Sequence, residues 1–149
     1  MSLSGAPIAI GDDHNGEDLG HVRVHQLNKD ESSWEQLGSN FDGYEKNDFF
    51  GTSVALSSDG KTLAIGAPVN WNIEEEGLLE YIRVFYLNDN TSTWDQVGQD
   101  IHGESSGDFF GFSLALSIDG KTLAIGAYGN DVNGDGSGHV RVYRLYDAD

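Results

Sequence analysis

The sequence predicts an all-β protein built from β-propeller blades, each a four-stranded antiparallel meander, which together form an incomplete ring. A near-identical repeat carries this prediction. Residues 48–67 (DFFGTSVALSSDGKTLAIGA) and 108–127 (DFFGFSLALSIDGKTLAIGA) lie sixty positions apart and differ at only three positions. A repeat of this length is typical of propellers and related arrays. No segment shows the 3.6-residue period of an amphipathic helix.

Each repeat opens with two short strands joined by a tight turn. In the first copy, Val54 and Leu56 alternate with smaller residues, and residues 62–65 resume the apolar pattern after a break. The break contains Asp59-Gly60, and an Asp-Gly pair between two apolar runs predicts a hairpin because glycine readily adopts positive φ. The second copy has the same turn one repeat later.

A third and a fourth strand follow in each repeat. The third strand has large residues at both odd and even positions, which predicts that it is covered on both faces. Its copies are residues 21–27, 81–87 and 139–145. The fourth strand is short and begins with a tryptophan, at Trp34 and at Trp94. Four strands in a meander describe a propeller blade, and a sandwich of two sheets is the alternative.

The phase of the repeat divides the chain into a partial, a complete and a second partial blade, over residues 1–47, 48–107 and 108–149. Gly5-Ala6-Pro7 aligns with Gly66-Ala67-Pro68, so we expect the first blade to begin at the end of its second strand. The tryptophan of the last blade would fall three residues beyond Asp149. Because so few blades do not close a ring, we expect a homo-oligomer formed by self-association, or a longer parent chain.

Two short motifs recur at the repeat spacing. Phe50-Gly51 is followed by Gly66-Ala67-Pro68, and Phe110-Gly111 is followed by Gly126-Ala127-Tyr128. This pairing resembles the FG-GAP repeat, the blade unit of integrin α-subunit propellers and of many bacterial and algal surface proteins. The resemblance implies a non-enzymatic binding or adhesion module that is secreted or lies at the cell surface.

The resemblance also implies calcium, which many blades of the family bind through an acidic run between the FG and GAP motifs. Here that run is reduced to Asp59 in one repeat and Asp119 in the other, each beside a lysine. Calcium prefers six to eight oxygen ligands. We therefore do not expect the family's usual calcium site in this chain.

A different calcium site is predicted in the loop after the last GAP motif. Asp131, Asn133 and Asp135 alternate and are followed by Gly136, like the first half of an EF-hand loop. The carboxylate expected near the end of such a loop is replaced by Val142. A solvated turn without metal is the alternative, because Asn, Asp and Gly form such turns by themselves.

Several repeated residues are predicted to be structural. The arginines Arg23, Arg83 and Arg141 recur at one position of the third strand, and we expect them to pair with Asp48 or Asp108 and so lock adjacent blades. Trp34 and Trp94 are expected to anchor blade packing.

Ligand contacts are predicted where the repeats disagree, in residues 12–18, 69–77 and 129–137. Trp71 lies in such a loop between two asparagines and has no counterpart in the other repeats, which suits contact with a glycan or a protein. Folding of the indole over its own blade is the alternative. Acidic clusters occupy the corresponding loops, at Asp13, Asn15, Glu17 and Asp18 and at Glu74, Glu75 and Glu76.

The composition narrows the possible partners. Twenty-five acidic against eight basic residues give a net charge of −17, which disfavours nucleic acid and anionic membranes and favours cations or basic partners. The absence of cysteine excludes disulfides and thiolate metal sites, and no apolar run is long enough to cross a membrane. No catalytic motif is present, so a fragment of a propeller hydrolase or lyase and a purely structural array are the alternative functions.

Overall fold

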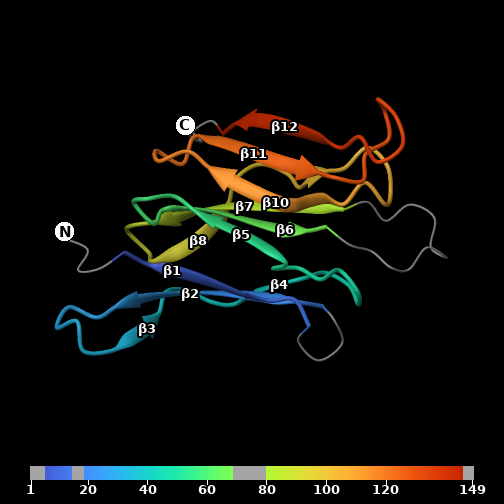
Figure 1. Ribbon diagram of the computed structural model, residues 1–149. Coiled ribbons are helices and arrows are strands. Elements are labelled where there is room, and N and C mark those ends of the chain that lie inside the picture. The colour runs from blue at the N-terminus through green and yellow to red at the C-terminus, as the bar shows by residue number, and fades with distance from the viewer. Residues whose placement is uncertain (1–5, 15–18, 69–79, 146–149) are drawn as a thin grey trace.

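The computed structural model describes residues 6–14, 19–68 and 80–145, which form three antiparallel sheets stacked face to face (Figure 1). The first sheet comprises β1 (Ile8–Asp12), β2 (His21–Leu27), β3 (Trp34–Gln36) and β4 (Phe41–Asp42). The middle sheet comprises β5 (Ser53–Leu56), β6 (Thr62–Ala67), β7 (Tyr81–Asn88), β8 (Thr93–Gln96) and β9 (Ile101–His102). The third sheet comprises β10 (Phe110–Leu116), β11 (Thr122–Ala127) and β12 (His139–Arg144).

Within each sheet the strands follow one another as an antiparallel meander. The fourth strand is interrupted in the first two sheets. In the middle sheet, β8 pairs with one half of β7, with Leu87 opposite Trp94, and β9 pairs with the other half, with Tyr81 opposite His102. The predicted tryptophan strand is therefore only the first half of the observed one.

The predicted Asp-Gly turn joins β5 to β6. Gly60 has φ of +70° and donates its N–H to the carbonyl oxygen of Ser57 at 2.9 Å. Gly120 has φ of +67° and makes the same hydrogen bond to Ser117. Because a side chain is strained at such φ, the glycine is required at both turns.

The predicted phase of the first sheet is wrong. β1 pairs with β2 as β6 pairs with β7, so Gly11 opposite Val22 corresponds to Gly66 opposite Ile82. The counterpart of residues 66–68 is therefore 11–13, not Gly5-Ala6-Pro7. The second strand of the first sheet is therefore β1. Residues 8–11 (IAIG) resemble residues 63–66 (LAIG), and this match agrees with the strand pairing, whereas the match of Gly5-Ala6-Pro7 to residues 66–68 does not.

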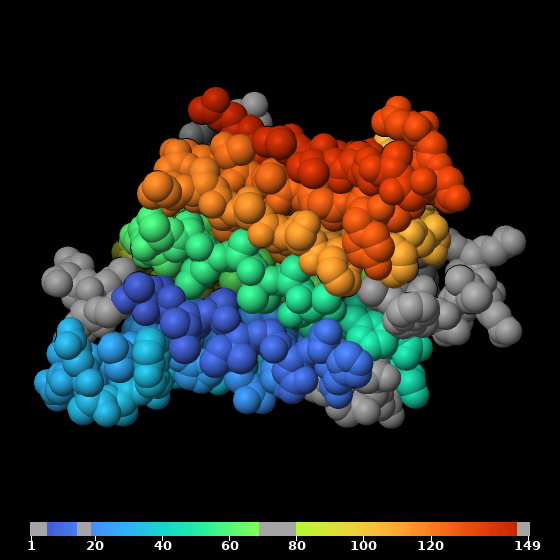
Figure 2. Space-filling view, viewed as in Figure 1, coloured from blue at the N-terminus to red at the C-terminus, as the bar shows by residue number. Residues whose placement is uncertain are grey.

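The core lies between the sheets, as two separate clusters. The first cluster joins the first and middle sheets through buried residues such as Val22, Phe50 and Leu63. The second joins the middle and third sheets through residues such as Ile82, Phe110 and Leu123. Figure 2 shows the middle sheet held between the other two layers, so β7 is covered on both faces, as the sequence predicted.

The third sheet packs against the middle sheet on one face, and the exposure of its side chains reflects this. In β7, Ile82 and Val84 are 0% and 2% exposed, whereas their counterparts in β12, Val140 and Val142, are 67% and 66% exposed.

Within the described residues, no helix is long and apolar enough to cross a membrane.

Candidate functional site

The two ends of the stacked sheets differ in character. Tight turns gather at one end (left in Figure 1), and the described connection between β11 and β12 lies at the other (right). We call this second end the loop end, and of the three segments in which the repeats disagree, residues 129–137 lie there. Trp71, Glu74, Glu75 and Glu76 in one of these segments, and Asn15, Glu17 and Asp18 in another, lie outside the described residues.

The described connection at the loop end is the segment between β11 and β12. Asp131, Asn133 and Asp135 are all exposed there. One carboxylate oxygen of Asp131 accepts the N–H of Gly136 at 2.6 Å, and the Asp131 carbonyl oxygen accepts the N–H of Gly134 at 2.9 Å. Asp131 thus closes the loop by itself, as such residues do in turns.

The predicted calcium ligands share this loop, and their role stays a prediction. The described part of the chain contains no group of three or more His, Cys, Asp or Glu side chains placed to hold a metal ion. Asp131, Asn133 and Asp135 would have to be completed by backbone carbonyl oxygens and water, which calcium accepts as ligands.

Asp59 and Asp119 are the acidic residues of the segment between the FG and GAP motifs, and each lies in a turn. Asp59 accepts the hydroxyl of Ser57 at 2.6 Å and the N–H of Lys61 at 3.0 Å. Asp119 makes the corresponding contacts, and the hydrogen bond from Ser117 holds the pKa of this carboxyl below its usual value. Both carboxylates are engaged in closing their turns.

A buried polar cluster lies beneath the loop end, between the middle and third sheets. Asp108 accepts the side-chain amide of Asn130 at 2.7 Å, and these residues are 7% and 1% exposed. Glu80, which is 3% exposed, accepts the N–H of Gly107 at 2.7 Å. Desolvation by burial raises the pKa of Glu80, although backbone N–H groups oppose the shift.

Glu80 is a residue that the repeat comparison missed. It occupies the position of Gly20 and Gly138, just before the third strand, so only a residue-by-residue alignment of that connection could have revealed it. Its second carboxylate oxygen, Oε2, is buried and has no hydrogen-bond partner in the described part of the chain. An unpaired buried oxygen carries an energetic cost.

The junction of the first and middle sheets has a different polar cluster. Asp48 accepts the hydroxyl of Tyr81 at 2.7 Å and the backbone N–H groups of Tyr44 and Glu45, each at 2.9 Å. Burial and the hydrogen bond with Asp48 raise the pKa of Tyr81. Asp48 and Asp108 thus occupy equivalent junctions, where their partners come from different elements.

The predicted pairing of the arginines with Asp48 or Asp108 is wrong. Arg83 donates from Nη1 to the carbonyl oxygen of Asp42 at 3.0 Å, and its guanidinium carbon lies 4.6 Å from the ring centroid of Tyr44. Arg141 forms an ion pair with Glu104. Tyr44 and Glu104 are equivalent residues of the preceding repeat, so the arginines do link adjacent sheets, through another position.

Arg23 and Trp34 belong to the first sheet and differ from their counterparts. The side chain of Arg23 is exposed. Trp34 is 49% exposed, whereas Trp94 is more buried, packs against the first core cluster and donates its indole N–H to the carbonyl oxygen of Leu37 at 3.0 Å. Trp94 thus has the environment expected of a packing anchor, while Trp34 is half exposed.

Exposed aromatic rings lie beside the 129–137 loop. The Tyr128 ring stacks on Phe109 with centroids 4.7 Å apart and meets Phe112 edge-on at 5.0 Å. Tyr128 and Phe112 are 55% and 47% exposed. Their counterparts in the preceding repeat are Pro68 and Thr52, so these substitutions between near-identical repeats were the signal for this cluster.

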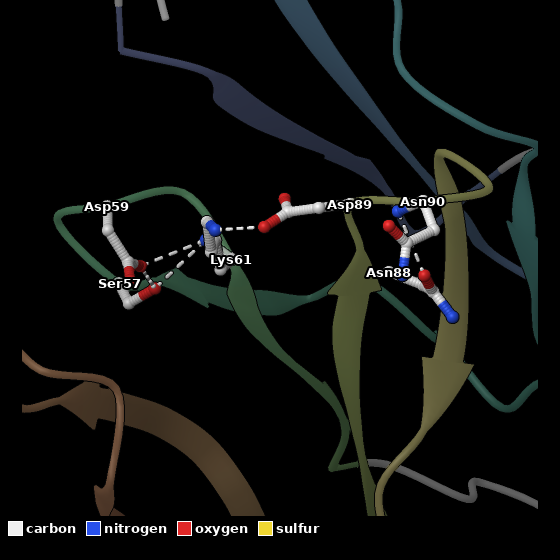
Figure 3. Close-up of polar contacts among 6 residues, drawn as sticks. All are labelled: Ser57, Asp59, Lys61, Asn88, Asp89 and Asn90. Carbon is white, nitrogen blue, oxygen red and sulfur yellow. Dashed lines mark hydrogen bonds and ion pairs between the residues drawn. The ribbon is translucent and has the colours of Figure 1, made fainter. Parts of the chain in front are cut away.

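The opposite end of the molecule, the turn end, carries a polar groove of about 780 Å³ between the middle and third sheets. Its wall includes Asp89 and Asn90 from the β7–β8 turn and Asp119 from the β10–β11 turn. Figure 3 shows Lys61 reaching from the β5–β6 turn to an ion pair with Asp89. This contact raises the pKa of Lys61.

The FG-GAP repeat profile matches residues 103–143, which contain the second FG and GAP motifs. No curated protein sequence matches the chain. Among solved structures, the periplasmic gluconolactonase of Pseudomonas aeruginosa, a propeller, is similar in fold, with a TM-score of 0.55 at 16% identity. The likeness covers 93% of this chain and 36% of that protein, so the chain spans about a third of its length. Residues 103–143 therefore match the FG-GAP repeat, and the three sheets have the fold of blades of a partial β-propeller.

Proposed function

We propose that the chain is part of a non-enzymatic binding or adhesion module of a surface or secreted protein, and that its loop end presents acidic and amide side chains to a cation, a glycan or a protein. One observation carries this proposal. Residues 131–137 are exposed in full, while the residues repeated between blades are engaged in holding the sheets together. Conserved scaffolds with exposed, variable loops are typical of binding proteins.

Calcium is the cation we propose for this loop, with Asp131, Asn133 and Asp135 as side-chain ligands. The net charge of −17 supports cation binding in general. A ligand that binds only the folded state stabilises it by about 2.7 kcal/mol at a concentration one hundred times its dissociation constant. Calcium should therefore raise the melting temperature of the wild-type chain.

The test compares the calcium-dependent rise in melting temperature between variants. We expect the double variant Asp131→Asn, Asp135→Asn to lose the rise, whereas Asp89→Asn, a matched change at the turn end, should keep it. Magnesium serves as the second probe, because it accepts this flexible arrangement of oxygens less readily. An equal rise in all three proteins would show that calcium acts through general charge screening, and would refute the proposed site.

A glycan or protein is the second class of ligand that we propose for the loop end. Exposed aromatic rings present large apolar faces at low entropic cost, and Tyr128 stands beside the acidic loop. Binding on a glycan array that is lost in Tyr128→Ala and in Trp71→Ala, but kept in Trp34→Ala, would support sugar recognition. Binding that survives both loop substitutions would contradict it.

An enzymatic role, as a fragment of a propeller hydrolase or lyase, is the second candidate. The observation that favours it is Glu80, a buried carboxyl with a raised pKa and one unpaired oxygen, near Asp108. Perturbed carboxyls of this kind occur at catalytic sites and also in structural clusters. Lactone or ester hydrolysis that disappears in Glu80→Gln would support this candidate, and its absence in the wild-type chain would favour the binding module or a purely structural array.

A further inference from the structure

The turn between β7 and β8 carries a short motif that the binding proposal does not use. Asn90-Thr91-Ser92 has the pattern Asn-X-Ser/Thr, which is the acceptor motif for an N-linked glycan. No other asparagine of the sequence has a serine or threonine two positions later. Because β7 ends at Asn88 and β8 begins at Thr93, the motif lies wholly within the turn.

The turn is exposed and lies away from the acidic loop. Residues 89–93 are all exposed. β7 runs from the loop end to the turn end (Figure 1), so Asn90 lies at the end of the molecule opposite residues 129–137. Exposed turn tips of this kind accommodate bulky additions most readily.

The exposure of this position is a property of the blade. Leu27 pairs with Trp34 as Leu87 pairs with Trp94, so Asp30 of the first blade corresponds to Asn90. Asp30 is also exposed, although the middle blade packed beside it has a fourth strand, β8 and β9. A complete neighbouring blade therefore leaves this position open to solvent.

The other residues of the turn hold it in place and leave the Asn90 side chain unused. The carboxamide oxygen of Asn88 accepts the backbone N–H of Asn90 at 3.0 Å (Figure 3), and its carbonyl oxygen accepts the N–H of Ser92 at 2.8 Å. Lys61 pairs with Asp89. In the described part of the chain, no hydrogen bond involves the carboxamide of Asn90 or the hydroxyl of Ser92.

The corresponding turn of the first blade lacks the acceptor. It has an aspartate, Asp30, in place of Asn90, and the hydroxyl of Ser32 accepts the side-chain amide of Asn28 at 3.1 Å. The two groups that define the motif, a carboxamide and a hydroxyl two residues later, are therefore both present and both unengaged only in the middle blade, among the turns that the structure describes.

We propose that Asn90 is an acceptor site for an N-linked glycan, transferred from a lipid diphosphate-linked oligosaccharide. The proposal rests on the proposed function, because a secreted or surface protein meets such a donor during export. The carboxamide nitrogen of Asn90 forms a bond to the anomeric carbon of the first sugar. The bond from that carbon to the diphosphate oxygen breaks, the lipid diphosphate leaves with the electron pair, and the nitrogen loses one proton.

The position of the glycan separates two surfaces of the molecule. A glycan is bulky and solubilising, so at Asn90 it covers the turn end. Asp131 and Asp135 lie at the loop end and stay accessible. Because the Asn90 carboxamide makes no contact within the described residues, the modification removes none of the hydrogen bonds that close the turn.

The test expresses the full chain behind an added, cleavable signal peptide in mammalian cells and examines protein from both the medium and the cell lysate. A peptide-N-glycosidase removes N-linked glycans and converts the acceptor asparagine to aspartate. We expect this treatment to increase the electrophoretic mobility of the wild-type chain, and peptide mass spectrometry to find aspartate at position 90. Asn90→Gln and Ser92→Ala should lose the mobility shift, whereas Ser92→Thr, which keeps the motif, should retain it.

The chain offers a matched control in its first blade. Asp30→Asn creates the same motif with Glu31 and Ser32 in the corresponding turn, and we expect this variant to gain a second glycan. The glycosylated wild type should melt at a temperature no lower than that of Asn90→Gln, since the carboxamide holds no part of the described fold.

Three results would overturn the proposal. They are a wild-type chain without glycan in both medium and lysate, a mobility shift that persists in Asn90→Gln, and a lower melting temperature of the glycosylated protein. None of them depends on the ligand of the loop end, because the signal peptide is supplied in the experiment. Loss of the calcium-dependent rise in melting temperature would instead refute the calcium site and leave the glycan acceptor unaffected.

Discussion

Gly66 in β6 and Gly111 in β10 lie so close together that a Cβ on Gly66 would stand 2.5 Å from the carbonyl oxygen of Gly111. The same relationship joins Gly11 to Gly51, where the distance would be 2.1 Å. Real Cβ atoms do not approach a backbone oxygen this closely, so the glycine of one blade's second strand is required by the FG glycine of the next blade. Ser53 reinforces the contact, because its hydroxyl donates to the same oxygen of Gly111 at 2.5 Å.

This contact predicts the cost of adding one methyl group. Gly66→Ala forces the two blades apart, and overpacking of this kind typically costs about 1–3 kcal/mol. Gly126→Ala is the matched control. A Cβ on Gly126 would stand 2.3 Å from the hydroxyl oxygen of Ser113, as a Cβ on Gly66 would from that of Ser53, but its nearest atoms include no backbone oxygen of another blade. In urea unfolding followed by circular dichroism, we expect Gly66→Ala to lose about 2 kcal/mol more than Gly126→Ala. Equal losses would mean that the serine, not the blade contact, sets the requirement.

The arginine of the third strand gives a second prediction. Arg83 stacks over Tyr44 and Phe85, at 4.6 and 5.0 Å from their ring centroids, and lysine cannot reproduce this planar contact. We expect Arg83→Lys to lower the unfolding free energy by about 1 kcal/mol, and Arg23→Lys, at an exposed residue, to change it by less than about 0.5 kcal/mol. In a Tyr44→Leu background the loss from Arg83→Lys should shrink. An undiminished loss there would exclude the stacking with Tyr44 as its cause.

Much of the fold was readable from the sequence because it depends on local features. The Asp59-Gly60 turn specifies its own backbone, and the alternation around Val54 and Leu56 specifies a strand. The sixty-residue repeat then fixes that the same meander recurs. The FG and GAP motifs were also readable, although the reason for their glycines, a contact between successive blades, becomes visible only in three dimensions.

The errors arose where a contact joins segments that are distant in sequence. The repeat identifies the position of Arg83 but not its partner. Arg83 contacts Tyr44 and Arg141 contacts Glu104, each in the segment just before the FG motif of a repeat. Because tyrosine and glutamate are unlike, the two repeats share no signal at this position. The predicted alignment of Gly5-Ala6-Pro7 with residues 66–68 is wrong because it rests on identical residue types alone, whereas the pairing of β1 with β2 sets the register.

The two fourth-strand tryptophans give a third prediction. Trp94 packs into the first core cluster and bonds to Leu37, so Trp94→Ala should lower the unfolding free energy by about 3 kcal/mol. Trp34 has the same place in the preceding blade but is half exposed, and Trp34→Ala should cost less than about 1 kcal/mol. Urea unfolding measures both. Similar losses would show that the indole's local contacts within its own sheet, rather than the neighbouring blade, provide the stabilisation.

Glu80 predicts an unusual dependence of stability on pH. Burial raises the pKa of its carboxyl above the ordinary value of 4.5, with Asp108 adding repulsion. The folded state therefore binds the proton more tightly than the unfolded state does. By linkage, the Glu80 carboxyl does not lower the unfolding free energy at a pH below its unfolded pKa. It lowers the unfolding free energy as the pH rises through the raised folded pKa. A carboxyl with a lowered pKa in the folded state has the opposite effect, because it adds to the unfolding free energy as the pH rises.

Glu80→Gln removes this charge and keeps an oxygen for the N–H of Gly107. At pH 7 we expect the variant to be more stable than the wild type by about 1 kcal/mol, because an unpaired buried charged oxygen is no longer present. The difference should shrink as the pH falls below the ordinary carboxyl pKa of 4.5 and vanish well below it, where the wild-type carboxyl is protonated in both states. Urea unfolding of both proteins across this range measures it, with Glu45→Gln, at an exposed position, as the control. A difference that stays constant with pH would contradict titration of Glu80 as its origin.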